Sequence, residues 1–189
     1  MAAKTPDAVL ARSRLWLERA VIGLNLCPFA KSVHLRGQVR WVLSDATDEA
    51  ALLADLLVEL ERLYDADPAD VETTLIVHPH VLGDFLDYND FLDVADAAVS
   101  ELDLDGEIQV ASFHPDYRFA DSDPESVENC SNRSPYPMLH LLRESSIARA
   151  VAAFPDAASI YERNIATLRK LGPAGWRRLW TDDAPGPEA

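Results

Sequence analysis

Apolar residues recur every three or four positions in three stretches before residue 100, which is the spacing of one helix face. These stretches lie at 10–24, 52–64 and 85–99. Between and after them lie short apolar runs that are typical of strands, at 39–43, 73–77 and 108–113. The pattern alternates between helix and strand, so we predict an α/β fold.

The connections between the three predicted strands are long enough for crossover helices, which join parallel strands. We expect a small, mainly parallel sheet of about three strands in β-α-β-α-β order, flanked by an N-terminal helix and by C-terminal helices. Helical periodicity is weak over 138–154 and clearer over 161–171, before the helix stop Gly172-Pro173. We expect a single α/β domain over residues 1–181 and a frayed tail over 182–189.

Composition narrows the class of protein. Of 189 residues, 48% are hydrophobic and 26% are charged, which is ordinary for a folded soluble chain. The net charge is −15, and residues 43–128 hold 24 acidic side chains against two basic ones. Such a surface repels nucleic acids and anionic membranes. Neither a secretory signal nor a membrane-spanning stretch is visible, so we expect a cytoplasmic protein.

Histidines follow two of the predicted strands. His78 and His80 follow the second strand, and His114 follows the third. Parallel strands place their carboxyl ends at one edge of the sheet, where ligands usually bind. We therefore expect a pocket at this edge, with the three histidines acting as metal ligands or as general acids and bases.

A divalent metal such as Zn²⁺ is one interpretation of these histidines, because three protein ligands and an open position form a usual catalytic site. Asp84, Asp116 or His140 would then be a fourth ligand or would orient a ligand. The alternative is structural: His78 bonds a backbone group at the strand end, and His80 sits at the entry to the following helix. The sequence leaves both alternatives open.

Residues 115–137 contain four prolines and show no regular period, which predicts a long loop. Long loops in compact domains are often functional. The Arg133 guanidinium suits a carboxylate or phosphate group, although it would equally neutralise nearby acidic residues. We predict that a small polar or anionic ligand contacts Asn132, Arg133, Ser134, Tyr136 and His140.

The chain has two cysteines, Cys27 and Cys130, which are too few for a disulfide scaffold. Cys27 begins the segment Cys-Pro-Phe-Ala, which also occurs in some glutathione-transferase and glutaredoxin-like proteins. There the thiol follows a strand, whereas here it follows a predicted helix. A catalytic Cys27 would need a histidine nearby as its base, and the alternative is a small buried apolar side chain.

Five long blocks of the sequence, at 19–31, 78–96, 111–120, 132–144 and 161–172, together resemble the uncharacterised family catalogued as domain of unknown function 1415. The similarity spans nearly the whole chain and implies a one-domain member. It implies no activity, cofactor or catalytic residue.

Taken together, these patterns favour an enzyme or ligand-binding protein that acts on a small polar or anionic molecule, with hydrolase-like chemistry supported by a metal or by histidine. One alternative is a non-catalytic module whose acidic surface docks a basic partner. Another is a thiol-based enzyme that uses Cys27. Phosphate loops, dinucleotide fingerprints and the serine nucleophile elbow are absent from the sequence, which disfavours those classes.

Overall fold

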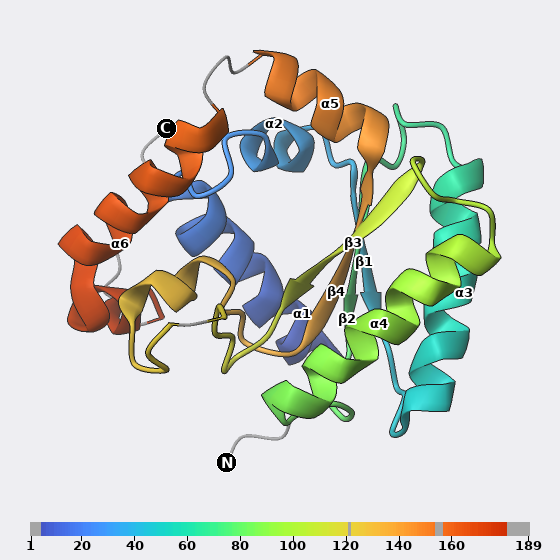
Figure 1. Ribbon diagram of the computed structural model, residues 1–189, viewed down its shortest axis with the longest axis horizontal. Coiled ribbons are helices and arrows are strands. Elements are labelled where there is room, and N and C mark those ends of the chain that lie inside the picture. The colour runs from blue at the N-terminus through green and yellow to red at the C-terminus, as the bar shows by residue number, and fades with distance from the viewer. Residues whose placement is uncertain (1–4, 121, 154–156, 181–189) are drawn as a thin grey trace.

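A mixed sheet of four strands forms the centre of the protein (Figure 1). The structure is a computed structural model that describes residues 5–120, 122–153 and 157–180. The sheet order is β1-β2-β4-β3, and the strands are β1 (Val39–Leu43), β2 (Thr73–Val77), β3 (Ile108–Phe113) and β4 (Met138–Arg143). β1 and β2 are parallel, whereas β4 is antiparallel to both of its neighbours. The predicted α/β class is confirmed.

The prediction of about three mainly parallel strands is wrong in its details, because β4 lies between β2 and β3. Residues 138–154 were expected to be helical, but 138–143 form β4 and helix α5 (Glu144–Ala153) begins only after it. Met138, Leu139 and Leu141 are fully buried, as expected for a strand covered on both faces. Such a strand shows no alternation, so its period does not distinguish it from a short buried helix.

β1, β2 and β3 nevertheless run in the same direction, because β4 is antiparallel to both β2 and β3. The carboxyl ends of these three strands therefore lie at one edge of the sheet, as predicted. β4 begins at that same edge, where Met138 pairs with Val77 on one side and with Phe113 on the other.

Two crossover helices cover one face of the sheet, α3 (Glu49–Asp65) and α4 (Phe85–Glu101). Each begins at an aspartate whose side chain accepts a hydrogen bond from a first-turn amide. Asp48 caps α3 and Asp84 caps α4. The apolar sides of both helices pack on the sheet, as their periodicity predicts.

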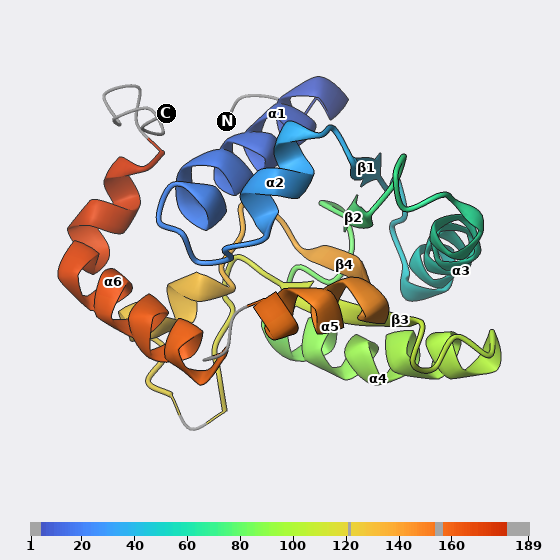
Figure 2. The ribbon, with the colours of Figure 1, turned by 90° about the horizontal axis from the view of Figure 1, so that it is seen from above.

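The other face is covered by the N-terminal segment (Figure 2). It consists of α1 (Pro6–Trp16), the π-helical segment η1 (Leu17–Ile22) and the short helix α2 (Ala30–Leu35). Trp16 and Ala20 lie within this second core against Leu75 and Met138 of the sheet. The sheet is thus enclosed between two helical layers.

Figure 1 shows α5 lying across the edge of the sheet where β4 ends. Farther along the chain, α6 (Ala157–Arg178) packs against the 3-10 helix η2 (Val127–Ser131), which interrupts the predicted long loop. α6 bends at Gly172, whose φ of 64° is left-handed, and Pro173 follows at the predicted helix stop.

The predicted tail over 182–189 lies outside the described residues. Within the described ranges, no helix is both long and apolar enough to cross a membrane.

Candidate functional site

Two of the three predicted strand-end histidines come together. His78 follows β2, His114 follows β3, and the ring of Tyr88 from α4 lies close to both. The ring centroids of His78 and Tyr88 are 5.9 Å apart, and those of Tyr88 and His114 are 5.0 Å apart. Both histidines are completely buried, so they form part of the packing and present no open mouth.

Backbone groups engage these two histidines. The His78 Nδ1 lies 3.2 Å from the carbonyl oxygen of Val81, and the His114 Nε2 lies 3.2 Å from that of Leu82. The His114 Nδ1 accepts a hydrogen bond from the Asp116 amide at 3.0 Å, which assigns the proton of a neutral ring to Nε2. Burial lowers the pKa of His78 to about 4 and lowers the pKa of His114. Both rings are therefore neutral at pH 7 and hold the loop 78–84 against the strand ends.

The third histidine does not join them. His80 lies in an exposed turn, Asp84 is occupied as the cap of α4, and Asp116 is exposed. Among the described residues, no group of three or more His, Cys, Asp and Glu side chains is arranged to hold a metal ion. The geometry at this edge resembles the structural alternative more than it resembles a zinc site.

The predicted ligand-binding residues of the loop bond to backbone groups of their own surroundings. The Asn132 amide donates to the carbonyl of Ser112 at 3.2 Å, and the Ser134 hydroxyl donates to the carbonyl of Tyr136 at 2.6 Å. The Arg133 guanidinium donates to two carbonyls, those of Tyr117 at 3.2 Å and Pro124 at 2.6 Å. These contacts fix the path of the loop, and Tyr136 packs against the core beneath α1 and η1.

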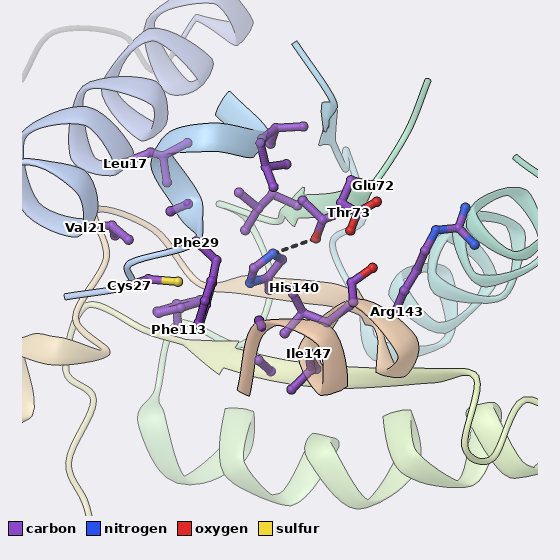
Figure 3. A pocket seen from close by; sticks show the side chains of 18 of the residues that line it. Leu17, Val21, Cys27, Phe29, Glu72, Thr73, Phe113, His140, Arg143 and Ile147 are labelled. Carbon is purple, nitrogen blue, oxygen red and sulfur yellow. Dashed lines mark hydrogen bonds between the residues drawn. The ribbon is translucent and has the colours of Figure 1, made fainter. Parts of the chain in front are cut away.

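A cavity of about 350 Å³ opens on the sheet face that faces α1, η1 and α2, and α5 closes part of it (Figure 3). Side chains from the helices and from all four strands form walls that are mostly apolar. They include Leu17, Val21, Phe29, Leu75, Phe113 and Ile147. Largely apolar clefts and cavities of a few hundred Å³ are the usual form of small-molecule sites.

His140 stands in the wall of this cavity, in the middle of β4, where it pairs with Leu75 and Ala111. Its Nε2 lies 2.7 Å from the hydroxyl oxygen of Thr73. The Thr73 hydroxyl donates its own proton to the carbonyl of Leu141 at 2.6 Å. Thr73 must therefore accept from His140, which assigns the imidazole proton to Nε2 and leaves Nδ1 as an acceptor.

The Nδ1 of His140 has no hydrogen-bond partner among the described residues. Figure 3 shows this nitrogen on the side of the ring away from Thr73, facing the cavity. Burial lowers the pKa of His140 to about 4. The ring is therefore neutral at pH 7, and the cavity contains a hydrogen-bond acceptor without a positive charge.

Cys27 lines the same cavity, from the connection between η1 and α2. Its side chain is partly exposed, and Figure 3 shows the sulfur directed into the cavity, on the side of His140 opposite Thr73. Cys130 differs: it is buried in a separate cluster with Leu26 and Leu168, and burial raises the pKa of its thiol.

The charged groups at the other end of the cavity are paired within the protein. The Arg143 guanidinium donates to the carbonyls of Leu63 at 2.6 Å and Ala66 at 2.7 Å, and Figure 3 shows it extending away from the cavity. Glu72 forms an ion pair with Arg149 at 3.4 Å. Nδ1 of His140 and the thiol of Cys27 are therefore the groups best placed to meet a ligand.

The sequence predicted Cys27 and His140 as site residues but did not predict that they share a cavity. The expected pocket lay at the carboxyl ends of the strands, whereas this cavity lies over a sheet face. The orienting residue Thr73 was missed, because its interaction with His140 depends on the pairing of β2 with β4. The available signal was the apolar run 138–142, which carries a single histidine at its centre.

The fold and the cavity define an α/β protein with a largely apolar pocket that is lined by one neutral histidine and one thiol. Residues 8–178 match a family described as a protein of unknown function (DUF1415), and the chain belongs to this family. A search of curated proteins and a search of solved structures return no match. The family match over residues 8–178 confirms the resemblance that the sequence blocks indicated.

Proposed function

We propose that the protein binds a small molecule with an apolar body in the cavity, and that a hydrogen-bond donor of this molecule bonds to Nδ1 of His140. The observation that carries the proposal is an acceptor nitrogen that faces an apolar cavity and has no partner among the described residues. A polar group in such surroundings is destabilising until it is paired, so a donor on the ligand gains affinity there.

The charge state of the pocket favours a neutral donor over an anion. His140 is uncharged at pH 7 because burial lowers its pKa to about 4. Arg143, the cation nearest the cavity, donates to backbone carbonyls. The proposed ligand is therefore more apolar than the small polar or anionic molecule expected from the sequence. The proposal includes a cytoplasmic location, which the two free cysteines support.

Calorimetric titration with two matched probes tests the proposal. 4-Methylphenol carries a hydroxyl donor, and 4-methylanisole has the same ring without it. We expect both to bind through apolar burial and the phenol to bind several-fold more tightly, because one net hydrogen bond contributes about 1 kcal/mol. In His140→Gln, the amide still reaches Thr73 but the acceptor at Nδ1 is lost, so the preference for the phenol should disappear.

A variant that fills the cavity provides a second test of the proposal. Ala111 lines the cavity beside His140, with which it pairs in the register of β3 and β4, and Ala111→Phe should abolish binding of both probes. Ala54→Phe adds the same side chain on the exposed side of α3 and should leave binding unchanged. Equal affinity for the probes in the wild type, or undiminished binding by Ala111→Phe, would contradict the proposed site.

A further inference from the structure

Cys27 and His140, a thiol and a neutral imidazole, line the same largely apolar cavity. We infer that Cys27 attacks the acyl carbon of a small apolar ester or thioester, with His140 as its proton acceptor. This inference rests on the proposed function, because the acyl group would occupy the proposed ligand cavity. It adds a reaction class, acyl transfer followed by hydrolysis, to the binding site.

The orientation of the base is the first support. A catalytic base next to a thiol is usually held in one tautomer and one orientation by a third group. Thr73 does this for His140, since it accepts from Nε2 while its own proton is committed to the carbonyl of Leu141. Figure 3 shows the free nitrogen on the side of the ring toward the Cys27 sulfur. No hydrogen bond joins these two atoms among the described residues, so the proton transfer requires the two side chains to approach each other within the cavity.

The residues around Cys27 are the second observation that supports the inference. Leu17, Val21 and Phe29 border the end of the cavity where Cys27 lies, so an apolar acyl chain finds contacts next to the sulfur. Cys27 is partly exposed and accessible, whereas Cys130 is 4% exposed and lies outside the cavity. The chain thus carries its own control thiol.

The reaction balances without an oxidant or reductant. The thiol proton of Cys27 moves to Nδ1 of His140 while the sulfur forms a bond to the acyl carbon. The bond from that carbon to the leaving oxygen or sulfur breaks, and the leaving group takes the proton from Nδ1. Water then adds to the thioester on Cys27, the sulfur–carbon bond breaks, and a carboxylic acid and the free thiol are produced.

The experiment measures acylation of the purified protein by p-nitrophenyl butanoate. Release of p-nitrophenol gives the rate, and intact-mass and peptide mass spectrometry locate the butanoyl group. We expect one butanoyl group on Cys27, none in Cys27→Ser, and an unchanged rate in Cys130→Ala. Excess 4-methylphenol should slow the reaction by occupying the same cavity.

His140→Gln distinguishes a catalytic role of His140 from a structural one, because the glutamine amide keeps a hydrogen-bond donor toward Thr73 but cannot accept the thiol proton as Nδ1 does. We expect acylation to slow by about 100-fold or more, the usual contribution of a positioned base. The wild-type rate should be nearly constant between about pH 5.5 and 7.5, since His140 is neutral throughout this range. Glu72 and Arg143, the other ionisable side chains lining the cavity with Cys27, are paired elsewhere in the protein.

Butanoylation of Cys130 or of another residue, or a wild-type rate in His140→Gln, would overturn the inference. So would an absence of acylation in a wild-type protein that binds 4-methylphenol, and in that case the proposed binding function stands. If 4-methylphenol does not bind and Cys27 is not acylated, both proposals fail together.

Discussion

One hydroxyl group joins the ends of two strands next to the buried histidines. The Tyr88 hydroxyl donates to the carbonyl of Met138 at 2.7 Å and accepts from the amide of Phe113 at 3.1 Å. Met138 and Phe113 face each other in the register of β4 and β3. Tyr88 therefore stands in the hydrogen-bond ladder of the sheet, and it lies close to the rings of His78 and His114.

At this residue scale, we predict that Tyr88→Phe destabilises the protein. It leaves a buried carbonyl and amide without their partner while it keeps the apolar ring, so the free energy of unfolding should fall by roughly 1–3 kcal/mol. Urea denaturation measures the change. Tyr64→Phe removes a hydroxyl from a side chain that is 53% exposed, and it should change stability little. Equal effects of the two substitutions would refute this account of Tyr88.

At the scale of elements, a buried carboxylate joins β1 to α3. Glu59 of α3 is only 4% exposed and accepts two hydrogen bonds from Arg40 of β1, at 2.7 and 3.0 Å. Arg62, one turn farther along the helix, donates a third at 2.9 Å. Hydrogen bonding to Glu59 raises the pKa of Arg40. The register of the crossover helix on the edge strand is therefore fixed by charge as well as by apolar packing.

We predict that Arg40→Met costs about 2 kcal/mol or more of stability, because it leaves Glu59 buried with Arg62 as its remaining cation. The double variant Arg40→Met with Glu59→Leu should recover much of the loss, since an apolar pair removes the buried charge. Chemical denaturation of both variants measures this. Glu61→Gln, on the exposed side of α3, is the matched control. A double variant less stable than Arg40→Met would contradict the prediction.

At the scale of the whole molecule, the sequence predicts the α/β class, three of the strands and the two crossover helices. The helices and 39–43 have a clear apolar period, and 73–77 and 108–113 contain β-branched residues. β4 could not be predicted in the same way, since Met138–Arg143 has no alternation and no β-branched residue, and its methionine and leucines are good helix formers. Because β4 was missed, the cavity on the sheet face was not predicted either. With 138–143 read as a helix, nothing places His140 beside Thr73 or over the same cavity as Cys27.

Three desolvated histidines also connect stability to pH for the molecule as a whole. The unfolded chain binds protons at a histidine pKa near 6.5, whereas folded His78 and His140 bind them only near 4. Between these values the unfolded state holds more protons, so stability falls as the pH decreases from about 6.5 toward 4. The lowered pKa of His114 acts in the same direction.

We expect each of His78 and His140 to contribute a loss of roughly 2 kcal/mol between about pH 7 and pH 5. Urea denaturation across this range measures the total, and His140→Gln should remove its share of the slope. A variant with the same pH dependence as the wild type would show that His140 is already protonated in the fold or is not desolvated there.

The place of β4 in the sheet also has a consequence for how the chain reaches this structure. Among the described residues β3 pairs with β4 alone, so residues 108–113 lack this partner strand until residues 138–143 have emerged from the ribosome. The first helices and the strands β1, β2 and β3 are synthesised before β4, and the sheet is complete only once β4 lies between β2 and β3. The insertion of β4 adds His140 to the wall of the cavity, which Cys27 also lines although it is synthesised more than a hundred residues earlier.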